Sequence, residues 1–196
     1  MSRNNMIVLA SGSPRRAELL LQIGVEFQIV PADIDETPKP NELAVDYVQR
    51  MAAEKAVTVA RLFPDRVVLA ADTSVIVDGE IWGKPLDRQH AKVMLAGLSG
   101  RSHQVMTALA VFCGGGVALE LNVTEVEFAV LTPEQIDTYI ASGDADDKAG
   151  AYGIQGVAGC FVKHLSGSYS GVMGLPLYET AVLLGKAGII LEPANE

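Results

Sequence analysis

Apolar runs and turn residues alternate along the chain, and this alternation predicts an interleaved series of strands and helices. The short apolar runs at 6–9 and 67–70 predict buried strands. After Asn41, apolar residues recur at helical spacing, which predicts a long helix that Asn41 caps and that runs to about Leu62. The run 67–70 is the centre of an expected strand over 66–71. The other expected helices span 14–23, 88–96, 133–142 and 175–186, and the other expected strands span 26–30, 102–113, 117–130, 160–165 and, at an edge, 189–191.

Turn signals predict how these elements connect. Asp78-Gly79 is typical of a tight hairpin between 74–77 and 81–82, and Gly114 to Gly116 joins the two longest strands. Thr132 and Gln135 have the spacing of a capping box. Hairpins among interleaved helices indicate an α/β fold with a mixed, twisted sheet and flanking helices. Because the chain has no repeat or long linker, we expect a single domain over 1–196.

The segment after the first strand is a candidate anion site. Ser13 stands where a helix N-cap belongs and Pro14 where the first helical residue belongs. A helix N-terminus presents unpaired N–H groups and a positive dipole end, and guanidinium groups bind phosphate oxygens in pairs. Arg15 and Arg16 therefore point to a phosphate-bearing ligand, although an ordinary capped helix with solvated arginines explains the local residues equally well.

Asp72 is the candidate for catalysis. It comes directly after the expected strand 66–71, so we expect it at the end of that strand, where ligand sites collect. Its carboxylate could activate water or bind a metal. The alternative is an aspartate that starts a turn or caps a backbone amide.

Other polar residues carry weaker signals. Gly83 and Pro85 restrict the backbone around Lys84, which suits either a phosphate ligand or a surface turn. The polar segment 144–150 is expected to be mobile, and a glycine-rich stretch with Gln155 follows it. The carboxamide of Gln155 offers a donor and an acceptor to a base edge. By themselves, Glu36 and Lys55 are typical of a solvated loop and an exposed helix face. The glycine-rich stretch 166–174 fits a loop that closes over a substrate or a plain loop.

Composition and charge limit the class of protein. Hydrophobic residues make up 49% and charged residues 20%, as in ordinary globular proteins. The net charge of −9 argues against nucleic-acid binding through a broad basic face, but not against a small phosphorylated ligand. No apolar run is long enough to span a membrane, and the run at 6–10 is too short for a signal peptide. Cys113 and Cys160 fit no metal spacing, so we expect buried free thiols and a cytoplasmic location.

Several short motifs together resemble the Maf family of nucleotide pyrophosphatases over 7–184. Each motif is weak by itself, but their shared order is specific. The stretch 148–156 is similar to the subgroup that acts on dTTP and UTP, whereas the sister subgroup that acts on 7-methyl-GTP differs around Thr73 and Gln155. The matching motifs are Ser11-Gly12-Ser13-Pro14-Arg15-Arg16, Asp35-Glu36-Thr37, Glu54-Lys55-Ala56, Ala71-Asp72-Thr73, Gly83-Lys84-Pro85 and Gly174-Leu175-Pro176.

The resemblance implies an elongated, two-lobed fold like that of the inosine triphosphate pyrophosphatases, with a central cleft. It implies cleavage between the α- and β-phosphates, which gives a nucleoside monophosphate and pyrophosphate. It implies Asp72 as catalytic base and Glu36 with Asp72 as ligands of Mg²⁺ or Mn²⁺. The substrate-binding residues that it implies are Ser11, Arg16, Lys55 and Lys84 for the phosphates and Arg15, Thr73 and Gln155 for substrate choice.

Alternatives remain at this stage. The chain could act on 7-methyl-GTP or another modified nucleotide, or it could bind nucleotides as a regulator of septum formation. Family analogy also raises a homodimer, although no apolar surface patch can be identified from the sequence.

Overall fold

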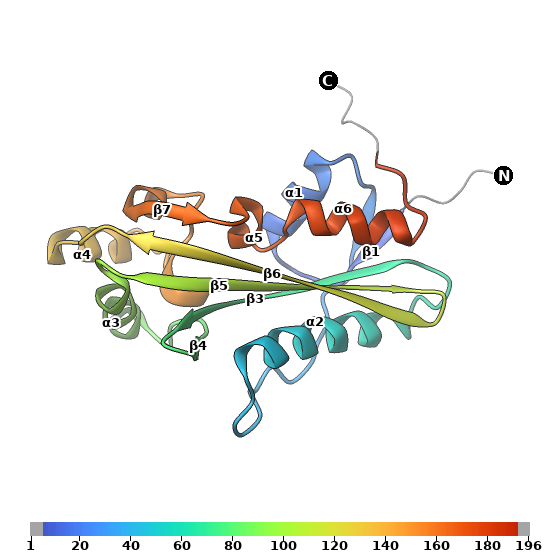
Figure 1. Cartoon of the computed structure of the whole chain (residues 1–196), viewed down its shortest axis with the longest axis horizontal. Coiled ribbons are helices and arrows are strands. Elements are labelled where there is room, and N and C mark those ends of the chain that lie inside the picture. The colour runs from blue at the N-terminus through green and yellow to red at the C-terminus, as the bar shows by residue number, and fades with distance from the viewer. Residues whose placement is uncertain (1–5, 192–196) are drawn as a thin grey trace.

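The computed structural model describes residues 6–191, which contain one seven-stranded mixed sheet. The strand order is β2-β1-β3-β5-β6-β7, and β4 pairs with β3. β1 runs parallel to β2 and β3, whereas the other pairs are antiparallel. β5 and β6 run along the long axis of an elongated molecule (Figure 1). The strands are β1 (Ile7–Leu9), β2 (Phe27–Ile29), β3 (Val68–Val77), β4 (Glu80–Trp82), β5 (Ser102–Cys113), β6 (Gly116–Phe128) and β7 (Val162–Ser166).

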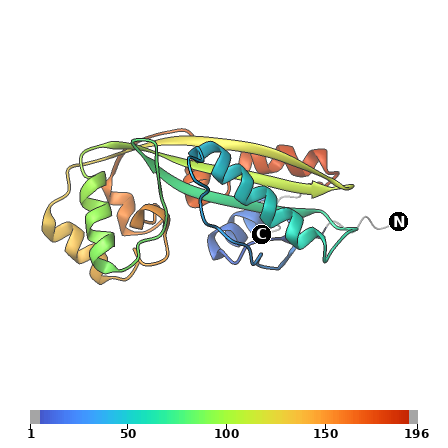
Figure 2. The ribbon, with the colours of Figure 1, turned by 90° about the horizontal axis from the view of Figure 1, so that it is seen from below.

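Helices flank both faces of this sheet. Figure 2 shows α2 lying along the sheet, with α3 and α4 gathered at one end. The helices are α1 (Pro14–Gln22), α2 (Ala44–Ala60), α3 (Arg88–Leu98), α4 (Pro133–Ala141), α5 (Tyr169–Met173) and α6 (Leu177–Lys186), with the 3-10 turns η1 (Ala149–Ala151) and η2 (Val157–Phe161). The expected fold class, a mixed sheet with flanking helices, is confirmed; the likeness to inosine triphosphate pyrophosphatases stays a prediction.

Alternation along β3 divides the core. Val68 and Ala70 face α2. Leu69 faces the other way, into a cluster with α1 and α6. Val75 shares that second face but packs into a different cluster, with α3 and α4. The face opposite α2 therefore carries separate apolar clusters at its two ends, and Thr73 lies between them.

One edge of β3 has a gap in its strand pairing. β5 pairs with the other edge continuously from Val68 to Ile76. On the gapped edge, β1 pairs through Val68 and Leu69, and β4 pairs from Val75 onward. Within 6–191, residues 70–74 of β3 thus have no strand partner on this edge. The gap leaves room for a ligand beside the middle of the strand.

Helix caps and turns that depend only on neighbouring residues form as predicted. Pro14 is the first residue of α1, with Ser13 as its N-cap, and Asp87 accepts a hydrogen bond from the backbone of His90 at the start of α3. The capping box of Thr132 and Gln135 is present. The hairpin between β3 and β4 turns at Asp78-Gly79, where both residues have positive φ.

The structure corrects the prediction for Asp72. This residue is not at a strand end: β3 continues through it, and Asp72 is paired with Ala108 of β5. The reason is that twelve-residue β5 supplies partners well beyond the apolar run. Asp72 is still at the sheet rim in another sense, because it lies in the gap between β1 and β4.

Other predictions were wrong in detail. Asn41 does not cap α2, whose N-cap is Leu43, because Asn41 has φ 58° and turns the chain before the helix. No strand forms over 189–191, and the expected loop 166–174 contains α5. Cys113 and Cys160 are free, as expected, but exposed rather than buried, because one lies at a hairpin end and the other in η2.

Candidate active site

A cavity of about 530 Å³ opens beside the gap in β3. Every residue that the sequence singles out for the site lines it. These side chains come from the loop before α1, the first turn of α1, the loop before α2, α2 itself, β3, the segment after β4 and the segment after η1. The residues are Ser11, Arg15, Arg16, Glu36, Lys55, Asp72, Thr73, Lys84 and Gln155.

Two carboxylates and a lysine form a charged trio in the cavity. Lys55 Nζ lies 2.8 Å from Asp72 Oδ1 and 2.8 Å from Glu36 Oε1. Lys55 is 8% exposed and Asp72 is 6% exposed, whereas the Glu36 side chain is 54% exposed. The view of Lys55 as an exposed helix residue is therefore wrong, because α2 turns this position toward β3. The ammonium keeps the buried Asp72 carboxylate paired.

The same carboxylates are the candidate metal ligands. Among residues 6–191, no group of three or more His, Cys, Asp or Glu side chains is placed to hold a metal. Mg²⁺ commonly uses one or two carboxylates and completes its shell with phosphate oxygens and water. Lys55 contacts one oxygen of each carboxylate, which leaves Asp72 Oδ2 and Glu36 Oε2 outside the ion pairs. The donor set therefore fits a cation that arrives with a phosphate ligand.

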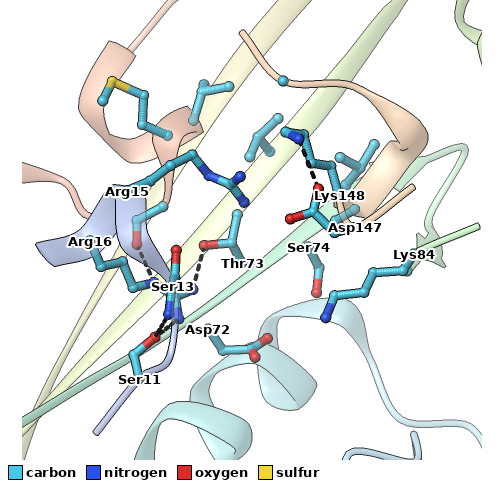
Figure 3. A pocket seen from close by; sticks show the side chains of 18 of the residues that line it. Ser11, Ser13, Arg15, Arg16, Asp72, Thr73, Ser74, Lys84, Asp147 and Lys148 are labelled. Atoms are coloured by element: carbon cyan, nitrogen blue, oxygen red, sulfur yellow. Dashed lines mark hydrogen bonds and ion pairs between the residues drawn. The ribbon is translucent and has the colours of Figure 1, made fainter. Parts of the chain in front are cut away.

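Arg16 joins segments that are far apart in the sequence. Its Nε donates to Gly174 O at 2.9 Å, its Nη1 to Ser11 Oγ at 2.9 Å and its Nη2 to Thr73 Oγ1 at 3.2 Å (Figure 3). Burial lowers the pKa of Arg16, and the negative charge of Asp72 opposes this. Each nitrogen of Arg16 is thus engaged within the protein, so the guanidinium positions Ser11 and Thr73 in addition to any contact with phosphate.

Arg15 and Lys84 differ from Arg16 in their orientation. Figure 3 shows their charged ends pointing toward the middle of the cavity from opposite sides. At the start of α1, the Ser13 hydroxyl makes no cap hydrogen bond, although Ser13 N donates to Ser11 Oγ at 3.2 Å. The N-terminal residues of α1, Arg15 and Lys84 thus line the same cavity, whereas Arg16, the second arginine of the predicted anion site, is engaged within the protein. Anion binding here stays a prediction.

Lys148 and two aspartates form a cluster that sequence reasoning did not single out. Lys148 Nζ lies 2.8 Å from Asp144 Oδ1 and 2.8 Å from Asp147 Oδ1. Burial by itself would lower the pKa of Lys148, but hydrogen bonds to both carboxylates raise it overall. Tyr139 Oη donates to Asp144 Oδ2 at 2.8 Å and accepts from Gly153 N at 3.0 Å. The cluster connects the segment before Gln155 to α4. In the sequence, this cluster could have been found from the aspartates that directly precede Lys148.

Close packing fixes the same segment. Gly150 has φ 69°, and a Cβ there would lie 2.7 Å from Val75 Cγ2. At Gly156 a Cβ would lie 2.8 Å from Asp144 Oδ2. The glycines thus allow the backbone to approach β3 and the Lys148 cluster, which brings Gln155 to the cavity.

Comparisons with known proteins agree over nearly the whole chain. A dTTP/UTP pyrophosphatase of Chromobacterium violaceum is 52% identical over 197 residues, covering 97% of this chain and 100% of that protein. Proteins of the same name from Methylobacillus flagellatus and Shewanella oneidensis are each 53% identical and each cover 94% of this chain, with 94% and 99% of their own lengths matched.

Within 6–191, no helix combines the length and apolar character needed to cross a bilayer.

Among solved structures, the Staphylococcus aureus Ham1 protein is similar at a TM-score of 0.47 with 16% identity, covering 63% of this chain and 72% of that one. The family model described as Maf-like protein matches residues 6–187. With that match and relatives of this similarity, the chain belongs to the Maf family.

Proposed function

We propose that this protein hydrolyses nucleoside triphosphates, dTTP and UTP foremost, between the α- and β-phosphates. The products are the nucleoside monophosphate and pyrophosphate. The observation that carries the proposal is the single cavity in which a buried carboxylate lies among Arg15, Lys55 and Lys84. Relatives that are named dTTP/UTP pyrophosphatases and are about half identical over nearly their full length support the same activity.

Asp72 is the general base in this proposal. Its carboxylate orients a water molecule toward the α-phosphorus and accepts a proton from it as the P–O bond to the leaving group breaks. Lys55 holds Asp72 Oδ1 at 2.8 Å, so the carboxylate has a fixed direction before substrate arrives. Arg15 and Lys84 face the triphosphate and neutralise the charge that develops on the pyrophosphate.

We propose Mg²⁺ or Mn²⁺ as the cofactor, held by Asp72 and Glu36 together with phosphate oxygens. When bound, such an ion withdraws charge from the phosphate and lowers the pKa of nearby water. Lys55 links the two carboxylates and keeps them close without a metal. The net charge of this trio is negative, which favours a divalent cation there.

Gln155 provides recognition of the base in this proposal. The edge of thymine or uracil presents an acceptor at O4 and a donor at N3, and one carboxamide carries the complementary pair. The edge of cytosine would need the amide to flip. Gln155 and Thr73 both line the cavity, so the two side chains are available to the same ligand.

The testing experiment measures pyrophosphate release from dTTP, UTP, CTP, ATP and 7-methyl-GTP with Mg²⁺ or Mn²⁺, with an excess of chelator as the metal-free control. Preparations of Asp72→Asn made in parallel reveal contaminating phosphatases. We expect release from dTTP and UTP that requires metal and is absent in the variant. Preference for 7-methyl-GTP would contradict the role of Gln155, and release of orthophosphate instead of pyrophosphate would contradict the reaction.

A further inference from the structure

Thr73 of the cavity has a buried partner on the neighbouring strand. Thr73 and Thr107 are paired across β3 and β5, and their Oγ1 atoms lie 3.0 Å apart. Leu69 O accepts from Ala10 N, so alternate residues of β3 from Leu69 onward point their backbone groups away from β5. Thr73 and Thr107 are thus a non-hydrogen-bonded pair, the kind in which facing side chains are closest. Thr107 is 0% exposed and does not line the cavity.

The contacts of this pair fix the direction of each hydrogen bond. Thr107 Oγ1 donates to Gly171 O at 2.8 Å, and a carbonyl can only accept. The single hydroxyl proton of Thr107 is therefore used, so the Thr73 hydroxyl must donate to Thr107. Arg16 Nη2 donates to Thr73 Oγ1 at 3.2 Å. With its proton committed and one lone pair occupied, Thr73 has only a lone pair left for a ligand.

Apolar side chains identify the part of the ligand that meets Thr73. Val75 follows Thr73 on the same face of β3, and Val105 lies opposite Val75 on β5. Both line the cavity, as do Val172 and Met173 of α5. The charged residues Lys55 and Asp72 belong to the other face of β3. A planar base fits the apolar side, whereas phosphate oxygens, which carry no proton to donate, gain nothing from Thr73.

We propose that Thr107 is a positioning residue that makes Thr73 a hydrogen-bond acceptor only and so selects a base with a ring N–H. This inference rests on the proposed function and deepens it. The N3–H of thymine or uracil is then shared between the free lone pair of Thr73 and the carbonyl oxygen of Gln155, while the amide of Gln155 donates to O4. In cytosine, N3 is an acceptor, and two lone pairs would then face each other without a proton between them.

The test compares Thr107→Val with Thr107→Ser. Valine has nearly the same shape but no hydroxyl, so the Thr73 proton loses its acceptor and can turn into the cavity. Serine keeps the hydroxyl and the chain of hydrogen bonds. Thr180→Val is the matched control. Thr180, on α6, is also 0% exposed, and its hydroxyl also donates to a carbonyl, that of Pro176.

The readout is the ratio of kcat/KM for UTP over CTP. We expect Thr107→Val to lower this ratio about tenfold, the size of one hydrogen bond made or mismatched. Thr107→Ser and Thr180→Val should keep the ratio of the unaltered protein. A purely structural role for Thr107 would lower both substrates equally and leave the ratio unchanged, and that result would overturn the proposal, as would a loss of selectivity in Thr107→Ser.

Calorimetric titration with UMP and CMP gives the ratio of the two binding affinities, which reports the preference for uracil over cytosine without turnover. If the unaltered protein releases no pyrophosphate from any nucleotide, the proposed function fails, yet the binding ratio still decides the role of Thr107. A drop of about tenfold in Thr107→Val alone supports it. An equal affinity for UMP and CMP in the unaltered protein overturns it.

Discussion

The two faces of β3 present different kinds of polar group to one cavity. Asp72 points to the α2 face, where Lys55 lies 2.8 Å away and Glu36 completes a charged trio. Thr73, the next residue, points to the opposite face, where it joins a chain of hydroxyls that ends on the carbonyl of Gly171. Successive residues of a strand point to opposite sides, so adjacent positions enter unlike surroundings.

In the proposed function, this difference separates chemistry from recognition. The charged trio of Lys55, Glu36 and Asp72, to which the proposal assigns the chemistry, lies on the α2 face, where an ion pair keeps the buried carboxylate in place. The hydroxyls of Thr73 and Thr107, whose donors and acceptors are already assigned, distinguish the base edges in this proposal. Arg16 contacts Thr73 directly and also feels the charge of Asp72, so it links the two faces.

The strongest test of the charged face is Asp72→Asn. The amide has the same shape but cannot accept a proton from water, so we expect kcat to fall by about 10³-fold. Binding of a nucleoside monophosphate, measured by calorimetry, should stay within a few-fold, because Arg15 and Thr73 are untouched. Full activity in this variant would break the assignment of chemistry to the α2 face.

Removing the lysine should cost folding free energy as well as activity. Lys55→Met leaves the Asp72 carboxylate buried without its cation, and we expect a loss of about 3 kcal/mol in the free energy of unfolding. Urea denaturation measures it. Lys92→Met is the control, because Lys92 pairs with Asp137 at 2.6 Å on an exposed surface, where such pairs contribute under about 1 kcal/mol. Equal losses in the two variants would contradict the special role of Lys55.

His103 tests whether the face of Thr73 stays uncharged. It points to the same side as Val105 and Thr107, and burial lowers the pKa of His103 to about 4, below 6.5 for a free imidazole. As pH falls through about 6.5, the unfolded chain takes up a proton that the folded chain refuses until about 4. The contribution of His103 to the free energy of unfolding is therefore complete above pH 6.5. It is lost as the pH falls toward 4, by up to about 3 kcal/mol.

Unfolding at several pH values, with His103→Gln beside the unaltered protein, measures this effect. The glutamine can still bond to Tyr152 Oη, which lies 2.8 Å from His103 Nε2, but does not titrate. We expect the slope between pH 6.5 and 4 to flatten in this variant. His164→Gln, at an exposed position on β7, is the control for replacing a histidine elsewhere in the sheet. An unchanged slope in His103→Gln would show that the decline belongs to other groups.

Gln155→Leu sharpens the recognition side of the comparison and should have the smallest effect. We expect kcat/KM for dTTP and UTP to fall about tenfold, since one pair of hydrogen bonds to the base is lost. Inhibition by pyrophosphate should not change, because the phosphates meet other residues. A uniform loss over all nucleotides would place Gln155 outside base recognition.

Local patterns predicted the elements whose signals act over a few residues. The capping box of Thr132 and Gln135, the cap at Asp87 and the hairpin at Asp78-Gly79 form from neighbours in sequence, so the sequence contained all the participants. Family motifs likewise selected residues that line one cavity. Their catalytic and binding roles stay predictions until the variants are measured.

The errors arose where distant partners decide the outcome. Asp72 looked like the end of a strand because the apolar run stops before it, but β5 carries the pairing past it. Lys55 looked exposed because nothing in its helix shows that two carboxylates lie across from it. Burial and pairing are properties of the assembled core and cannot be derived from one segment.

The sequence by itself determined which residues are adjacent, which turns are tight and which side chains alternate across a strand. It thus determined that Asp72 and Thr73 face opposite ways once a strand forms. Only the tertiary structure decided what each one meets: Lys55 from α2 on one side, and Thr107 with the carbonyl of Gly171 on the other. The reason is that an ion pair or a hydrogen bond needs its partner within about 3 Å, a condition that packing of distant segments alone fulfils.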